Sequence, residues 1–181
     1  EKTDGGLLVP RGFCRQMILL CKKHHIEYRV DDQRRILPEV NFQFHGELKN
    51  FQRRAVGDIS KRDFRTLYAA TGCGKTVMAL HDIAGKEQSA LVICHTKELL
   101  YQWRDRAVQF LGMDEKEIGL LGAGKKTVGD RLTIGIVNTV VKMAHEIRER
   151  FGNLVIDECH RVPTKTFTDA VSAFDTKYML G

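Results

Sequence analysis

The stretch from Ala69 to Thr76 (AATGCGKT) has the residue types and spacing of a phosphate-binding loop. Gly72 and Gly74 let the backbone curl so that its N–H groups point at an anion. The ammonium group of Lys75 can reach terminal phosphates, and the hydroxyl of Thr76 can bind Mg²⁺. Such a loop normally begins with glycine, whereas this one begins with alanine, so only the looser form of the pattern is met. On the loop alone, a glycine-rich turn without a ligand is an alternative.

A second group of chemistry-bearing residues stands at the end of an apolar run. Asp157 and Glu158 directly follow residues 153–156 (NLVI), and two adjacent carboxylates repel each other unless a cation or a shared task holds them. Mg²⁺ bound to ATP phosphates supplies that cation. Asp157 would hold the metal through water, while Glu158 would orient or deprotonate the attacking water. Because ligands collect where the strands of an open parallel sheet end, the loop and the acid pair predict one shared site.

The apolar pattern predicts the elements that position these groups. A strand over residues 65–68 precedes the loop, and a helix that starts at Lys75 follows it. Residues 90–94 form a continuous apolar run, as expected of a strand buried on both faces. Thr96 is placed to cap the next helix, whose inner stripe includes Trp103. Further strands are expected over residues 118–121, 132–137, 153–156 and from 178 onward, with helices over residues 139–150 and 167–174.

This alternation predicts an α/β fold with a mostly parallel sheet and helices on both faces, extending over residues 47–181. Residues 1–35 are expected to form a small accessory unit of β-α-β type, with strands over 7–9 and 26–30 and a helix from Pro10. Its basic residues suit either a solvated face or contact with a nucleic-acid backbone, and the first is the simpler interpretation. Residues 36–46 have no clear period and are expected to be a linker.

The helix expected after this linker carries a glutamine that could recognise a base. Leu48, Phe51, Ala55 and Ile59 would share its inner face, and Gln52 lies early in it. A side-chain amide offers both a donor and an acceptor to the edge of adenine. On the residues alone, however, a surface glutamine is the simpler interpretation.

Composition narrows the class of protein. The net charge of +6 over 181 residues fits a polyanionic partner such as nucleic acid. Even the longest apolar runs, residues 17–21 and 90–94, are far too short to span a membrane, and the first residues lack a secretory signal, so a cytoplasmic location is expected. The five cysteines are odd in number and have no metal-binding spacing, which predicts free thiols: Cys14, Cys21, Cys73, Cys94 and Cys159.

Four segments in order, ATGCGKT, ICHTKELLYQW, IVNTVVK and VIDECHRVP, resemble motifs I, Ia, Ic and II of superfamily 2 helicases. More narrowly, the chain resembles the DEAD/DEAH-type family that groups the helicase domain of type III restriction subunits with the XPB-like DNA helicases. The resemblance extends from Leu48 to Gly181 and covers nearly all of one RecA-like domain. Cys73 stands where serine or alanine is common, and Cys159 replaces the alanine of DEAH.

The resemblance implies roles for individual residues. Lys75, Asp157, Glu158 and His160 would carry out hydrolysis, with His160 linking the site to a partner domain, and Thr76 and Asp157 would hold Mg²⁺. Three further residues, Thr96, Lys97 and Thr139, match positions that contact the nucleic-acid backbone; alternatively they are a helix cap, an exposed lysine and a second cap. The residues implied to bind ATP are Gln52, Ala70, Thr71, Gly72, Cys73, Gly74, Lys75 and Thr76.

The implied function is that of the first motor domain of an ATP-dependent helicase or translocase that acts on nucleic acid, with DNA favoured over RNA. The next family motif would begin beyond Gly181, followed by a second RecA-like domain with arginine fingers. We therefore expect this chain alone to bind nucleotide and hydrolyse it hardly at all. Alternatives are the motor of a restriction endonuclease subunit and a nucleic-acid-binding module switched by ATP. A kinase-like P-loop enzyme is disfavoured, because the DECH sequence and the Thr96-Lys97 segment would then be coincidences.

Overall fold

The computed structural model describes residues 2–3, 6–7, 9, 11–161 and 165–181. Contacts divide the chain into two units, Glu1–Gln33 and Arg34–Gly181. Among the helices of the described residues, none combines the length and apolar character that crossing a bilayer requires. All five cysteines are free, as predicted.

The first unit contains a short antiparallel strand pair, β1 (Lys2–Thr3) and β2 (Gly6–Leu7), followed by η1 (Arg11–Phe13) and α1 (Cys14–Lys23). The strand predicted over residues 26–30 is wrong, because the backbone there forms no strand and all five side chains are exposed. Alternation alone does not make a strand when no partner strand or core receives its apolar side. Leu8 and Pro10, on which the predicted first strand and helix start depend, lie outside the described residues.

The second unit is built on one sheet of seven strands in the order β3-β9-β8-β4-β7-β5-β6. Every neighbouring pair is parallel except the hairpin of β5 and β6. The strands are β3 (Phe64–Arg65), β4 (Ala90–Cys94), β5 (Gly119–Gly122), β6 (Lys125–Lys126), β7 (Leu132–Ile136), β8 (Asn153–Ile156) and β9 (Tyr178–Leu180). The predicted α/β class with a mostly parallel sheet is confirmed.

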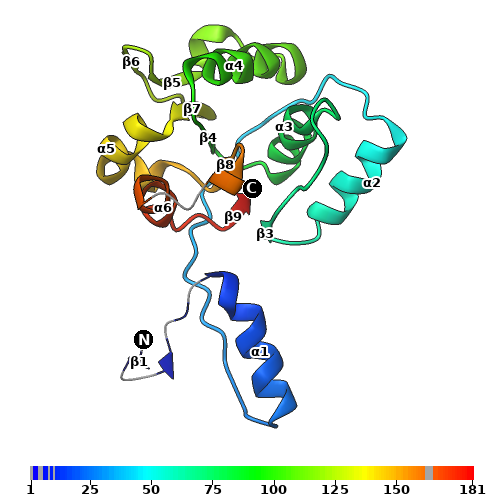
Figure 1. Ribbon diagram of the computed structural model, residues 1–181, viewed down its shortest axis with the longest axis vertical. Coiled ribbons are helices and arrows are strands. Elements are labelled where there is room, and N and C mark those ends of the chain that lie inside the picture. The colour runs from blue at the N-terminus through cyan, green and yellow to red at the C-terminus, as the bar shows by residue number, and fades with distance from the viewer. Residues whose placement is uncertain (1, 4–5, 8, 10, 162–164) are drawn as a thin grey trace. The chain divides into compact units, whose positions relative to one another are not determined.

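Helices cover both faces of this sheet (Figure 1). The helices of the second unit are α2 (Asn50–Ile59), α3 (Lys75–Lys86), α4 (Lys97–Leu111), α5 (Val137–Ile147) and α6 (Lys165–Ser172), with 3₁₀ turns η2 (Glu115–Glu117), η3 (Arg148–Arg150) and η4 (Cys159–Arg161). Strand β4 divides the core, because successive side chains point to opposite faces. Ala90, Val92 and Cys94 pack with α3 and α4, whereas Leu91 and Ile93 pack with α5 and α6.

Residues 36–46, expected as a linker, pack against the second unit. The backbone N–H of Val40 donates to Glu87 O (2.9 Å), and that of His45 donates to Phe110 O (2.8 Å). Phe42 is buried in the cluster formed with α3 and α4. Phe44 stacks on Phe110 with ring centroids 6.0 Å apart, so backbone hydrogen bonds and two aromatic side chains hold a segment whose sequence has no regular period.

Candidate nucleotide and nucleic-acid site

The phosphate loop connects β3 to α3. Gly72 and Gly74 have φ of +81° and +84°, in the left-handed region that glycine adopts without steric cost. Helix α3 begins at Lys75, immediately after the second glycine, so the positive end of its dipole faces the loop. Lys75 Nζ donates to Ala69 O (3.1 Å), which holds the ammonium group across the loop. The result is a backbone concavity with a cation at its side, suited to an anion.

Gln52 braces this loop from α2. Its Oε1 accepts from the backbone N–H of Lys49 (2.9 Å), and its Nε2 donates to Cys73 O (2.8 Å). The side chain is 6 % exposed, so the interpretation of a surface glutamine is wrong. The helix is rotated from the predicted face: Phe51 is exposed, and the residues of α2 buried beneath it are Gln52, Val56 and Ile59.

The acid pair follows β8. The Asp157 backbone N–H donates to Ile93 O (2.9 Å), which continues the pairing of β8 with β4 by one residue. Glu158 has φ of +55°, a conformation that costs a non-glycine residue about 1–3 kcal/mol. His160 Nδ1 lies 3.2 Å from Glu158 Oε2. The turn therefore holds Glu158 in a strained conformation beside a histidine, while Asp157 stays fixed to the sheet.

The loop and the acid pair leave the sheet at the same edge, the one formed by the carboxyl ends of the parallel strands. Strand β9 lies between β3 and β8 and is parallel to both, so the carboxyl ends of all three meet there. With strands about 4.8 Å apart, β3 and β8 are separated by about 10 Å. The backbone N–H of Leu67 donates to Gly181 O (2.7 Å), which extends this order beyond the strands. One nucleotide with its phosphates can span such a separation.

The residues implied to contact nucleic acid follow the next strands along that edge. Thr96 caps α4, and its hydroxyl accepts from the Leu99 N–H (3.3 Å), as predicted; Lys97 is exposed. Thr139 lies in the first turn of α5, whose cap position is Ile136, so the alternative interpretation of Thr139 as a helix cap is wrong. Strand β7 runs directly into α5, which starts at Val137, two residues earlier than expected. Because β4 and β7 are parallel neighbours, the two helix starts lie side by side.

A buried thiol lies beneath the acid pair. Burial, together with the nearby charge of Asp157, raises the pKa of Cys94 to about 12. Its Sγ contacts Gly135 O at 3.5 Å. Burial, with the charges of Glu158 and Asp157, also raises the pKa of the Cys159 thiol. Both cysteines are therefore protonated near neutral pH and are unsuited to act as nucleophiles.

Two contacts at this site were not predicted from the sequence. Trp103 Nε1 donates to Asp157 Oδ2 (2.9 Å), although the prediction assigned Trp103 only to a core stripe. Arg65 in β3 and Asp82 in α3 form a buried bidentate ion pair with N–O distances of 3.2 and 2.8 Å. Burial raises the pKa of Asp82, and the charge of Arg65 opposes this shift. In the sequence, the feature that could have indicated this ion pair is an aspartate among the apolar residues that α3 turns toward the core.

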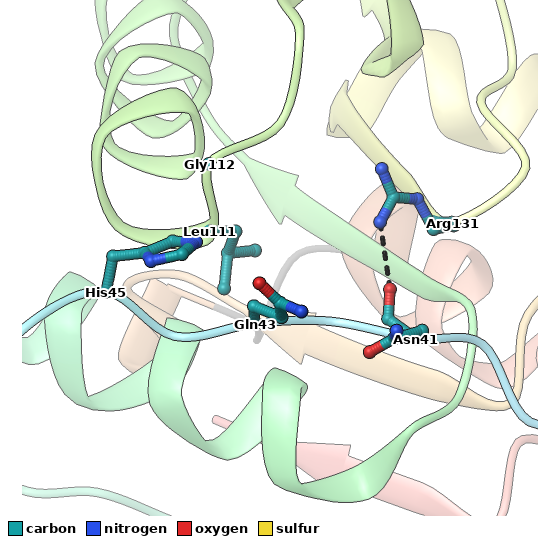
Figure 2. A pocket seen from close by; sticks show the side chains of 6 residues that line it. All are labelled: Asn41, Gln43, His45, Leu111, Gly112 and Arg131. Atoms are coloured by element: carbon teal, nitrogen blue, oxygen red, sulfur yellow. Dashed lines mark hydrogen bonds between the residues drawn. The ribbon is translucent and has the colours of Figure 1, made fainter.

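A small pocket lies away from these residues, near the amino ends of the strands, because Arg131 in its lining directly precedes β7. Figure 2 shows the residues that line it. Its volume is about 170 Å³, and its lining includes Arg131, which precedes β7, and Leu111, which ends α4. Arg131 Nη1 donates to Asn41 O (2.8 Å). None of the predicted site residues lines it. The pocket is therefore separate from the edge that carries the four motifs.

Comparisons with known proteins identify the family and the fold of the chain. The family model described as type III restriction enzyme, res subunit, matches residues 31–181. The DNA 3'-5' translocase XPB2 of Sulfurisphaera tokodaii is 24% identical over 163 residues, which cover 88% of this chain and 36% of that protein. The chain thus spans about a third of this relative's length.

Two solved structures have a similar fold. The UvsW helicase of bacteriophage T4 aligns with a TM-score of 0.72 and 20% identity, covering 99% of this chain and 72% of the other. The Sulfolobus solfataricus SWI2/SNF2 ATPase core, solved in complex with dsDNA, aligns with a TM-score of 0.64 and 17% identity, covering 81% and 33%. At these identities the likeness concerns the RecA-like fold.

Proposed function

Because this chain belongs to the family of type III restriction enzyme res subunits, we propose that it is the first motor domain of an ATP-dependent helicase or translocase. The observation that carries the proposal is the shared sheet edge, where the loops after β3, β8, β4 and β7 bear the residues of four motifs. The names of the similar proteins, a translocase and a helicase, support the same function.

ATP would bind on the loop between β3 and α3. Residues 70–76 supply backbone N–H groups and the Lys75 ammonium group for the phosphates. Among the described residues, the oxygen and the nitrogen of the Gln52 amide each make one hydrogen bond to the protein, so one N–H and one lone pair are left to pair with adenine. With this pairing, Gln52 would contact the adenine base and the phosphate loop at the same time.

The donor set at the site fits Mg²⁺, a hard cation that prefers oxygen ligands and retains several waters. Thr76 offers a hydroxyl in the first turn of α3, and Asp157 offers a carboxylate at the end of β8. When bound, the ion would neutralise charge on the phosphates. Glu158 would orient or deprotonate the attacking water, and His160 would hold the Glu158 carboxylate in position.

Hydrolysis would require a second RecA-like domain, which we place after this one in the full protein. An arginine supplied across the domain boundary stabilises the transition state by about 10³-fold or more. Nucleic acid would lie along the starts of α4 and α5, with Thr96, Lys97 and Thr139 facing its phosphates. Similar proteins are named for DNA or for RNA, and we favour DNA because the XPB2 translocase is named for DNA and the SWI2/SNF2 ATPase core was solved with dsDNA.

The proposal is tested with the full-length protein and the 181-residue chain. Steady-state ATP hydrolysis is measured with and without single-stranded DNA and RNA, for wild type and for Lys75→Ala. We expect DNA-stimulated turnover in the full-length protein, none in Lys75→Ala, and almost none in the 181-residue chain. Undiminished turnover in Lys75→Ala would remove the proposed site, and DNA-stimulated turnover by the short chain would contradict the need for a second domain.

A further inference from the structure

The indole of Trp103 is tied to the acid pair. Trp103 is the seventh residue of α4, is 3 % exposed and packs in the core cluster that includes Leu80 and Leu100. Its Nε1 donates to Asp157 Oδ2 at 2.9 Å, across 54 residues of sequence. In the described part of the chain this is the one hydrogen bond made to the Asp157 side chain. A core side chain and a functional carboxylate are therefore directly joined.

The contact constrains the carboxylate more than a surface hydrogen bond would. A buried indole N–H without a partner costs about 1–3 kcal/mol, and hydrogen bonds to charged groups are stronger than neutral ones. The indole is confined by its surroundings, because it is buried in the core cluster and α4, which carries it, is capped at Thr96 and packs against α3 and β7. Oδ2 is consequently held in place, which leaves Oδ1 as the oxygen available to a metal-bound water.

We propose that Trp103 is a positioning residue that orients the Asp157 carboxylate for Mg²⁺; this rests on the function proposed above. Partners in the outer shell of a metal ligand fix its orientation, and their loss typically costs 10–100-fold in metal affinity or activity. With Oδ2 engaged, Asp157 would offer its other oxygen to the ion or to a water on it, which suits a cation that retains several waters and is held by few carboxylates. The simpler alternative is that Trp103 only fills the core and that its N–H donates to Asp157 because this is the nearest hydrogen-bond acceptor.

The two possibilities differ in what the N–H itself does. Trp103 is the single tryptophan of the chain, so one amber codon suffices to exchange it. Replacement with β-(3-benzothienyl)alanine keeps the shape of the ring system but substitutes sulfur for the N–H. Replacement with 5-fluorotryptophan keeps the N–H and is the matched control. ADP binding to the 181-residue chain is measured against Mg²⁺ concentration, and thermal melting without Mg²⁺ monitors folding.

We expect the benzothienyl variant to need 10–100-fold more Mg²⁺ for half-maximal enhancement of ADP binding, with Mg²⁺-free ADP affinity unchanged. The 5-fluorotryptophan variant should match wild type. Equal Mg²⁺ requirements in the two variants would overturn the inference, even if the benzothienyl variant melted at lower temperature, because that is the signature of packing alone. Wild type without any Mg²⁺-dependent ADP binding would overturn the proposed function as well.

Discussion

Replacing Gln52 with alanine tests whether the phosphate loop depends on a brace from α2. The substitution removes the hydrogen bonds to Lys49 N–H and Cys73 O. Each is neutral and contributes a net of about 1 kcal/mol, so unfolding free energy should fall by about 2 kcal/mol. For a chain of this size, that corresponds to a melting temperature about 4–8 °C lower. Thermal unfolding followed by circular dichroism without nucleotide measures the change.

The matched control is Gln102→Ala, because this glutamine is exposed on α4 and should change stability by no more than about 0.5 kcal/mol. A second arm uses Gly74→Ala, whose added Cβ would lie 2.5 Å from Gln52 Nε2 at φ of +84°. In the Gln52→Ala background the clash disappears and only the backbone strain is left, so Gly74→Ala should cost less there. A Gln52→Ala variant that melts with wild type, or strictly additive effects in the double variant, would refute the brace.

Two further predictions concern groups around the loop. Asp82→Ala leaves the buried Arg65 without its partner and should lower the free energy of unfolding by about 3–5 kcal/mol. The control Asp58→Ala breaks an exposed pair with Lys61 and should lower it by at most about 1 kcal/mol. Equal denaturant midpoints for the two variants would be inconsistent with the buried ion pair. Iodoacetamide at pH 8 should label Cys73, nucleotide should protect it, and Cys94, with its pKa of about 12, should resist labelling. Peptide mapping by mass spectrometry gives both results, and labelling of Cys94 ahead of Cys73 would oppose them.

Local patterns predicted much of the second unit. The family resemblance is confirmed by the family model, and β4 has the predicted bounds because a doubly buried strand is a continuous apolar run. Thr96 caps α4 as its residue type favours. The start of α5 was misjudged because no cap residue separates it from β7, and the N-terminal alternation failed because none of the described strands pairs with residues 26–30.

The contacts that refine the candidate site were beyond such patterns. The hydrogen bond from Gln52 to Cys73 joins residues separated by 21 positions in the sequence. The contacts of Arg65 with Asp82 and of Trp103 with Asp157 join residues separated by 17 and by 54 positions. Each pairing depends on which elements pack together and on the rotamers they impose. Residue type and spacing identify the motif residues, whereas their supporting partners follow from the tertiary arrangement.

We propose that the phosphate loop and the acid pair form one metal–nucleotide site. Titration of ADP into the 181-residue chain, with and without Mg²⁺, tests it in wild type, Lys75→Ala and Asp157→Ala. We predict that Lys75→Ala weakens ADP binding under both conditions, while Asp157→Ala removes only the enhancement by Mg²⁺. Full Mg²⁺ enhancement in Asp157→Ala would contradict the account, because the carboxylate would then lie outside the site that holds the nucleotide.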